Sequence, residues 1–387
     1  MSQNSKDDVN RARTSRRSFL KMAAVAGGML GIPGISQVAG SQSGSPRIIQ
    51  TSSKSGRPSI TIAGYPYDRV KGLVDGKVKV EGCDTRFDVS NIYQLNAVAM
   101  GGDQKWEVQE IGLHPFMLAH ANNGFRDYTL IPVFPLRTFR HKSMFIRTDR
   151  GINKPEDLRG KTVASAGYSQ SSPVWIRGIL QHEYGIKPED MQWIISRKSS
   201  DKGKVSKNES ALPEGVPIQF GPEGVDESEL LAAGKVDAVL SAKEPQAYID
   251  GHPKIAHLFS DYRQVERAYF TKTGIFPIMH AVAIRQDVVK KNPWLPEAVF
   301  QAYSQAKQQM YMALQDLGWA MISLPWIGKE LEDTQELMGK NFWPYGIAPN
   351  RKALEALFQY SYEQGLAKRK LTIEELFHPS TLHLIET

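Results

Sequence analysis

The chain has 387 residues, a formal net charge of +7 and a hydrophobic content of 41%. About 330 of these residues follow residue 57, enough for a large core and more typical of two domains than of one. The only cysteine is Cys83, which excludes an intramolecular disulfide. Its place in the turn-like stretch Glu81-Gly82-Cys83-Asp84 favours a small structural residue over a catalytic nucleophile.

The first forty residues carry the pattern of a twin-arginine export signal. Arg16 and Arg17 are followed by Ser18-Phe19-Leu20-Lys21 and by an apolar, glycine-rich stretch over residues 22–35. That stretch is shorter than the ~20 residues that cross a bilayer, so we interpret it as the core of a removable signal with cleavage near residues 38–41. A disordered basic tail is the alternative, and such tails lack an apolar segment. We therefore expect recognition by the twin-arginine translocase, only transient contact with the membrane, and a periplasmic location.

The signal also explains most of the positive charge. Residues 1–40 hold six basic and two acidic side chains, so the formal net charge without them falls from +7 to +3. A chain of that charge gives no reason to expect nucleic acid as a partner. The serine-rich residues 41–57 are expected to form a flexible lead-in.

From residue 59 onward, apolar runs alternate with helix-length amphipathic segments, a pattern typical of an α/β fold with mostly parallel sheets. Strands are predicted at residues 59–63, 85–89, 108–113, 130–134, 143–146, 162–166, 191–195, 238–241 and 281–284. Helices are predicted at residues 93–101, 115–122, 173–184, 227–233, 297–317, 331–339 and 351–364.

A second unit begins in this pattern near Lys154, where a short helical turn, Gly160 and a buried strand follow one another. The strand at residues 281–284 would return the chain to the first unit. We therefore expect a double hinge, with lobe 1 formed by residues 58–145 plus 276–387 and lobe 2 by residues 146–275. A ligand cleft between two such lobes closes by hinge motion.

Several stretches resemble the 4,5-dihydroxyphthalate decarboxylase family and, more broadly, the type 2 periplasmic-binding fold of solute-binding proteins. The matching stretches are Tyr67-Asp68-Arg69 with Leu73-Val74-Asp75-Gly76, residues 132–141, residues 174–180, residues 273–280 and Phe342-Trp343-Pro344-Tyr345-Gly346. They occur in the family's order between residues 60 and 377. The resemblance implies a two-lobed α/β fold with an interlobe cleft.

The most conspicuous of these stretches is Arg137-Thr138-Phe139-Arg140-His141. Two guanidinium groups and an imidazole suit a carboxylate, which arginine binds bidentately and histidine protonates or orients. At the end of a strand, Arg137, Phe139 and His141 would share one face, with Arg140 on the other. Surface charges on a loop are the alternative.

A second candidate is the start of the helix predicted from residue 173. Ser169, Ser171 and Ser172 precede Pro173, which suits a helix N-terminus whose free N–H groups hold an anion. Trp175 and Arg177 follow, two residues apart and on different faces of the helix. The resemblance implies small residues such as Thr-Ala-Ala at the positions before Val174-Trp175. Because serines stand there in this chain, the sequence does not decide the identity of the substrate.

Aromatic and charged residues at the other motifs complete the predicted site. His280 is a general acid or, equally, a buried histidine satisfied by the backbone, and Asp68 with Arg69 is a cleft pair or a structural salt bridge. We predict these ligand-binding residues: Tyr67, Arg69, Arg137, Arg140, Ser169, Ser171, Ser172, Trp175, Arg177, Phe276, Trp343 and Tyr345. Trp343 and Tyr345 would stack on an aromatic ligand or pack in the core. In an enzyme, His141, His280 or Asp68 would donate the proton.

We predict the first of two functions and keep the second as its alternative. The export signal and the anion-binding features favour a solute-binding component of an ABC-type transporter, which captures a small, aromatic carboxylate and delivers it to a membrane permease. The family resemblance favours a carboxy-lyase that releases carbon dioxide from a hydroxylated aromatic acid. No cofactor is predicted. The nine histidines show no zinc-ligand spacing, although ligands scattered along the sequence leave a metal open.

Overall fold

The computed structural model describes residues 56–198, 212–316 and 322–386. The predicted export signal with Arg16 and Arg17, and the lead-in as far as residue 55, lie outside the described residues. Within them, no helix is both long and apolar enough to span a membrane.

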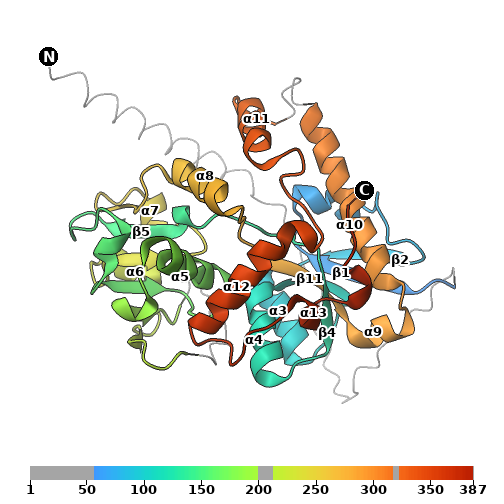
Figure 1. Ribbon diagram of the computed structural model, residues 1–387, viewed down its shortest axis with the longest axis horizontal. Coiled ribbons are helices and arrows are strands. Elements are labelled where there is room, and N and C mark those ends of the chain that lie inside the picture. The colour runs from blue at the N-terminus through green and yellow to red at the C-terminus, as the bar shows by residue number, and fades with distance from the viewer. Residues whose placement is uncertain (1–55, 199–211, 317–321, 387) are drawn as a thin grey trace, which may run out of the picture. The chain divides into compact units, whose positions relative to one another are not determined.

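The described strands form two sheets (Figure 1). The first sheet has the order β2-β1-β3-β11-β4. Its strands are β1 (Ser59–Gly64), β2 (Asp84–Val89), β3 (Val108–Gly112), β4 (Tyr128–Ile131) and β11 (His280–Arg285). β1 runs parallel to β2 and β3, whereas β11 runs antiparallel to both of its neighbours, β3 and β4.

The second sheet has the order β10-β5-β9-β6-β7-β8. Its strands are β5 (Met144–Arg147), β6 (Thr162–Ser165), β7 (Gln192–Ile195), β8 (Ile218–Phe220), β9 (Ala238–Leu240) and β10 (Ile255–His257). β5 is antiparallel to both β9 and β10, and the other pairs are parallel. In each sheet, the antiparallel strand is therefore the first strand formed after the chain crosses from the other sheet.

The two crossing segments, residues 132–143 and 274–279, are hydrogen-bonded to each other. Arg137 pairs with Ile278 in an isolated antiparallel bridge. The amide of Thr138 donates to the carbonyl of Pro277 at 3.1 Å, and that of Met279 to Leu136 at 2.9 Å. The connection between the sheets is thus a two-stranded ribbon, so neither crossing can shift without the other.

Helices cover the faces of both sheets. They are α2 (Lys71–Val74), α3 (Ile92–Gly101), α4 (Leu113–Asn123), α5 (Ser171–Tyr184), α6 (Glu227–Ala232), α7 (Gln246–Ile249), α8 (Tyr262–Thr273), α9 (Gln286–Lys291), α10 (Leu295–Gln315), α11 (Ile327–Met338), α12 (Arg351–Glu363) and α13 (Ile373–Leu376). Side-chain caps fix several starts: Asn91 accepts from the amide of Gln94 at α3, and Asp226 and Glu229 form a capping box at α6.

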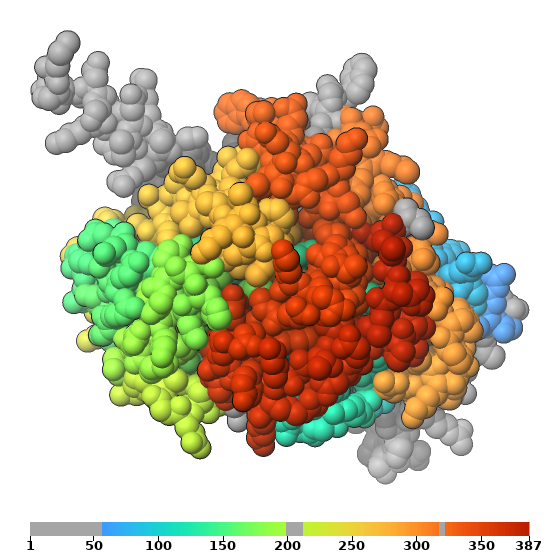
Figure 2. All heavy atoms as spheres, viewed as in Figure 1, coloured from blue at the N-terminus to red at the C-terminus, as the bar shows by residue number. Residues whose placement is uncertain are grey.

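One hydrophobic core joins the two sheets. Apolar residues of β3 and β11 belong to the same buried cluster as those of β6 and β9, together with Trp175 of α5 and Leu357 of α12. A second cluster packs α10 against the first sheet, and a third packs α6 and α7 against the second. On the face seen in Figure 2, the red C-terminal residues lie between the green residues at the left and the orange and blue residues at the right.

The contact between α5 and α12 depends on the absence of a side chain at Gly178. A Cβ at this position would lie 2.0 Å from the ring of Tyr360 on α12. We therefore expect Gly178→Ala to lower the free energy of unfolding by about 1–3 kcal/mol, because overpacking outweighs the helix propensity gained.

Gly328 on α11 is the matched control for this prediction. A Cβ there meets nothing within 4 Å, so Gly328→Ala should leave stability unchanged or raise it by roughly 1 kcal/mol or less. Urea denaturation of both variants tests the difference. Equal stability of the two variants would show that α12 moves away from α5 without cost.

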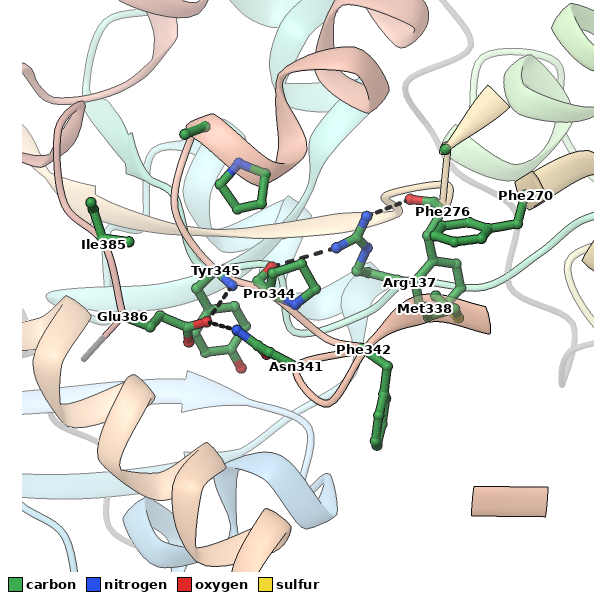
Figure 3. A pocket seen from close by; sticks show the side chains of 13 residues that line it. Arg137, Phe270, Phe276, Met338, Asn341, Phe342, Pro344, Tyr345, Ile385 and Glu386 are labelled. Atoms are coloured by element: carbon green, nitrogen blue, oxygen red, sulfur yellow. Dashed lines mark hydrogen bonds between the residues drawn. The ribbon is translucent and has the colours of Figure 1, made fainter. Parts of the chain in front are cut away.

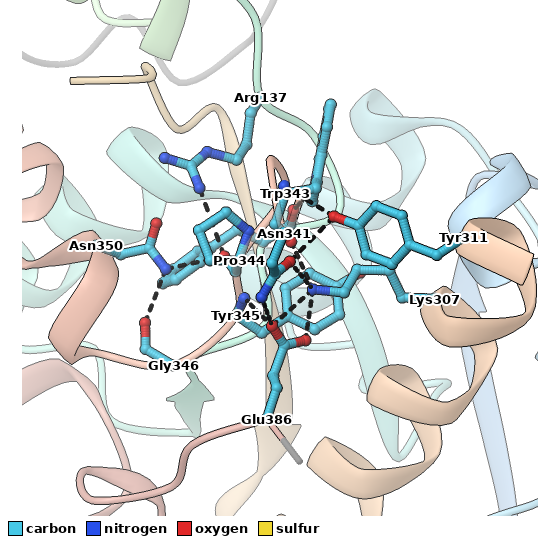
Figure 4. Close-up of polar contacts among 11 residues, drawn as sticks. Arg137, Lys307, Tyr311, Asn341, Trp343, Pro344, Tyr345, Gly346, Asn350 and Glu386 are labelled. Atoms are coloured by element: carbon cyan, nitrogen blue, oxygen red, sulfur yellow. Dashed lines mark hydrogen bonds and ion pairs between the residues drawn. The ribbon is translucent and has the colours of Figure 1, made fainter. Parts of the chain in front are cut away.

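A buried ion pair fixes the C-terminal segment to α10 (Figure 4). The ammonium of Lys307, which is 0% exposed, lies 2.5 Å from one oxygen of Glu386 and donates to the carbonyl of Trp343 at 2.6 Å. Glu386 also accepts from the amide of Tyr345 and the side-chain amide of Asn341, each at 2.9 Å. We call these five residues the Lys307–Glu386 network. Burial lowers the pKa of Lys307 to about 8, and Glu386 opposes that shift.

The α/β class and all nine predicted strands are confirmed, as are the seven predicted helices to within a few residues at their described ends. The structure adds the strands β8 and β10, the helix α8 and the short helices α2, α7, α9 and α13, none of which was among the predicted elements. Predicted residue 317 of the long helix lies outside the described residues.

Candidate functional site

A histidine–carboxylate pair lies between two neighbouring strands of the first sheet. His280, the first residue of β11, is opposite Gly112 of β3, and Glu110 lies two residues before Gly112 on the same face. The Nδ1 atom of His280 is 2.5 Å from a carboxylate oxygen of Glu110. Gly112 has no side chain to fill the space opposite His280, so the imidazole can reach along the strand to Glu110.

Glu110 is held in place by the loop that follows β1. One oxygen accepts from the hydroxyl of Tyr67 at 3.0 Å, and the other accepts from the amide of Tyr65 at 3.1 Å. The side chain of Glu110 is 2% exposed. Burial, followed by the neighbouring Glu110 charge, raises the pKa of Tyr67 far above its usual value, so its hydroxyl remains a donor.

The other ring nitrogen of His280 is left available. Glu110 occupies Nδ1, and no described residue hydrogen-bonds to Nε2. The imidazole is 11% exposed, and the ring of Tyr65 lies alongside it with centroids 6.3 Å apart. A carboxylate that accepts from one ring nitrogen orients the ring and stabilises its protonated form, so this geometry suits proton transfer at Nε2.

The N-terminus of α5 lies immediately beside His280. Ser171 donates its hydroxyl to the carbonyl of Met279 at 3.0 Å, and Trp175 donates its indole N–H to Ile278 at 2.9 Å. Ser172 contacts the sulfur of Met279 at 3.7 Å. The first turn of α5 is therefore fixed to the residues that directly precede His280, and the positive end of its dipole favours an anion at this place.

Comparison with known proteins identifies the family, although no family model matches the chain. It is 35% identical over 323 residues to 4,5-dihydroxyphthalate decarboxylase of Comamonas testosteroni, over 84% of this chain and 97% of that protein. The Pseudomonas putida protein of the same name is 33% identical over 203 residues, covering 52% of this chain and 78% of that protein. The chain belongs to the 4,5-dihydroxyphthalate decarboxylase family.

The fold of this decarboxylase-family chain is that of periplasmic-binding proteins. A periplasmic sulfonate-binding protein of a sulfonate ABC transporter from Methylobacillus flagellatus superposes with a TM-score of 0.54 at 16% identity. The match covers 84% of this chain and 93% of that one. The expected type 2 periplasmic-binding fold is thereby confirmed.

Among the residues predicted for the site, Arg69 and the aromatic residues around it lie together. The guanidinium of Arg69 lies between the rings of Tyr67, at 4.1 Å, and Trp343, at 4.0 Å, and donates to the carbonyl of Pro135 at 2.6 Å. Asp68 pairs with Arg69 at 3.0 Å and is mostly exposed. Arg69 therefore braces Tyr67, which in turn holds Glu110, whereas Asp68 pairs with Arg69 and not with His280.

The Arg137–His141 motif of the decarboxylase family does not lie at the end of a strand in this chain. β4 ends at Ile131, and the motif lies in the first crossing segment, where Arg137 forms the isolated bridge with Ile278. Arg137 donates to the carbonyls of Phe276, at 2.7 Å, and Pro344. Arg140 donates to the carbonyl of Ala242 at 3.1 Å. The two buried guanidinium groups thus bind separate parts of the backbone.

His141 lies against two aromatic rings. Its ring packs against Phe259 and Tyr269, and neither ring nitrogen has a partner among the described residues. Burial lowers the pKa of His141 to about 4. The imidazole is therefore neutral at pH 7, unlike a poised proton donor.

This depressed pKa predicts sensitivity to acid. Between the unfolded value of about 6.5 and the folded value of about 4, only the unfolded chain binds the proton, so stability falls as the pH drops through this window. His141 should contribute about 3 kcal/mol to that loss. In urea titrations from pH 7 to pH 4, His141→Phe should lose less stability than the wild type. His383→Phe, at an exposed position, should follow the wild type, and identical curves for all three proteins would contradict the prediction.

The remaining predicted residues are buried within the protein. Arg177 donates to the side chain of Gln364 and to the carbonyl of Tyr168, which ties α5 to the end of α12. The carbonyl of Ser169 is 2.6 Å from Nδ1 of buried His114. Tyr345 lies under the ammonium of Lys307 at 4.2 Å. These contacts position α5 and the C-terminal segment. The residues that make them are not immediate neighbours of His280.

Sequence reasoning did not identify Glu110. The available signal was a carboxylate in the middle of the strand Val108–Gly112, every residue of which is buried. A buried charge requires a partner, and that requirement points to a functional pair. No group of three or more potential metal-ligating side chains occurs among residues 56–198, 212–316 and 322–386.

Proposed function

We propose that this chain is an aromatic carboxy-lyase that releases carbon dioxide from a hydroxylated aromatic dicarboxylate of the 4,5-dihydroxyphthalate type, with His280 as proton donor. The observation that carries the proposal is the His280–Glu110 pair, with Nε2 unpaired and accessible. The identity of 35% across 97% of a decarboxylase supports the substrate class.

The reaction needs one proton and no redox step. Protonated His280 delivers the Nε2 proton to the ring carbon that carries the departing carboxylate. A hydroxyl para to that carbon makes it electron-rich. The bond between the ring and the carboxylate then breaks, its electron pair restores the aromatic ring, and carbon dioxide leaves. Glu110 stabilises the imidazolium before transfer, and neutral His280 regains a proton from water.

The surroundings of the pair supply substrate binding. The N-terminus of α5, fixed by Ser171 beside Met279, favours a substrate carboxylate. Tyr65 offers an aromatic face next to the imidazole. Of the three predicted proton donors, His280 is the one with a carboxylate partner and an accessible ring. His141 is buried against aromatic rings, and Asp68 is paired with Arg69.

A second candidate is an exported solute-binding component of an ABC-type transporter, acting with a membrane permease. The specific support is the twin-arginine pattern at Arg16 and Arg17 together with a fold shared with a periplasmic sulfonate-binding protein. In this reading the same anion-binding features capture a small aromatic carboxylate without converting it. A periplasmic location and export by the twin-arginine translocase belong to both candidates.

Carbon dioxide release separates the candidates. The full chain is incubated with 4,5-dihydroxyphthalate. Carbon dioxide and the dihydroxybenzoate product are then quantified over time. Sustained release in proportion to protein supports the carboxy-lyase. Saturable binding of the same compound by calorimetry, with no release over many binding lifetimes, would overturn it in favour of the solute-binding protein.

A further inference from the structure

A cavity with a volume of about 570 Å³ lies between the crossing segments and the C-terminal part of the chain (Figure 3). Its walls include four aromatic rings, of Phe270, Phe276, Phe342 and Tyr345, and the side chains of Met338 and Ile385. The volume falls within the roughly 300–1,000 Å³ that small-molecule sites occupy. The walls suit a flat, apolar body.

The polar feature of this cavity is Arg137. Its guanidinium is buried, and two of its five N–H groups donate to the carbonyls of Phe276, at 2.7 Å, and Pro344, at 3.4 Å. Its Nε has no partner, and no described carboxylate forms an ion pair with it. Burial lowers the pKa of Arg137 to about 9, so the group still carries its charge at neutral pH.

The one acidic side chain in the cavity wall does not neutralise this charge. Glu386 is 5% exposed and lies 2.5 Å from the ammonium of Lys307, whose positive charge balances it. The charges at the cavity therefore leave one uncompensated positive charge, that of Arg137. A buried unpaired cation is costly, and an anionic ligand would relieve that cost.

This cavity is separate from the site at His280. Its walls contain none of Tyr67, Glu110 and His280. Trp343 lies between the two regions: its ring contacts the guanidinium of Arg69 at 4.0 Å on the side of Tyr67, and meets the ring of Phe276 edge-on at 5.3 Å on the cavity side.

We propose that the cavity is a second binding site, for an aromatic carboxylate whose carboxylate group is bound by Arg137. Arginine binds a carboxylate bidentately, and the phenylalanine rings pack against an aromatic body. The site joins both crossing segments to the C-terminal part, because Arg137 bonds to Phe276 and Pro344. The proposal does not rest on the reaction at His280.

Calorimetric titration with benzoate, and with benzamide as its uncharged analogue, tests this site in the full chain. We expect Arg137→Met to weaken benzoate binding at least tenfold, and Arg86→Met, at an exposed position on β2, to change it less than twofold. Benzamide should bind at least tenfold more weakly than benzoate. Equal benzoate affinity in Arg137→Met and the wild type, or equal affinity for benzamide, would overturn the proposal.

Two further measurements keep the test decisive. Met338→Glu places a carboxylate in the cavity wall without removing the arginine, and it should also weaken benzoate binding. This variant therefore tests the site even where Arg137→Met does not fold. Crystals soaked with 4-iodobenzoate should show anomalous iodine signal in the cavity. If His280→Gln instead abolishes benzoate binding and the iodine lies at His280, the cavity proposal fails while the proposed reaction stands.

Discussion

The His280→Gln variant is expected to release carbon dioxide from 4,5-dihydroxyphthalate roughly 10²- to 10⁴-fold more slowly than the wild type, the usual contribution of a positioned general acid. Glutamine is similar in size and still donates a hydrogen bond to Glu110, so the fold and substrate binding should be retained. Initial rates at saturating substrate, with binding measured separately by calorimetry, give the change in kcat and in affinity.

Glu110→Gln should act through the histidine. The amide keeps the contact with Nδ1 but removes the negative charge that faces the imidazole, so kcat should fall while the affinity for the substrate is retained. The rate at pH 7 should fall less than in His280→Gln. An unchanged kcat would show that Glu110 has only a structural role.

The control for both variants is His383→Gln, which alters an exposed histidine far along the chain and should retain the wild-type rate. Full activity of His280→Gln would contradict the assignment of the proton donor. If His141→Gln or Asp68→Asn instead lost activity without loss of folding, the proton would come from one of those groups.

The Lys307→Met variant is expected to lose about 3–5 kcal/mol of unfolding free energy, because the Glu386 carboxylate would remain buried without its counter-charge. Lys307 is completely buried, and Glu386 also accepts from Asn341 and Tyr345, so the carboxylate cannot leave without breaking the Lys307–Glu386 network. Urea denaturation followed by tryptophan fluorescence measures the loss.

Two comparisons make this result specific. Lys329→Met removes an exposed lysine that pairs with Glu332 and Asp333 on α11, and should cost less than about 1 kcal/mol. The double variant Lys307→Met with Glu386→Leu removes both buried charges and should recover most of the stability. A loss of under about 1 kcal/mol in Lys307→Met would mean that water reaches Glu386.

The sequence was sufficient for the elements with strong hydrophobic periodicity. It did not indicate β8 and β10, because each has three residues and lies at an edge of the second sheet, and the residues of β8 are largely exposed. α8 was also not indicated. Its sequence is polar, and of its twelve residues Glu266 and Tyr269 are the buried ones, so its position depends on contacts that no local pattern encodes.

The site shows the same limit. The motifs located His280, Tyr67 and the start of α5, which follow or precede strands at fixed places in the α/β pattern. The partner of His280 is 170 residues away in sequence, and a pairing of that range depends on the register of β11 against β3. Arg137 and Arg140 were expected to bind the same ligand because both belong to one five-residue motif. In the structure their side chains donate to different carbonyls.

The position of β11 also determines the order in which this protein can fold. β11 lies between β3 and β4, and β4 has no other strand beside it in the first sheet. Every strand of the second sheet is synthesised before residue 280. Until β11 emerges, the edges of β3 and β4 that face it in the finished sheet have no partner. Pairing over such a separation is slow. The His280–Glu110 contact therefore cannot form until every strand of the second sheet has been synthesised.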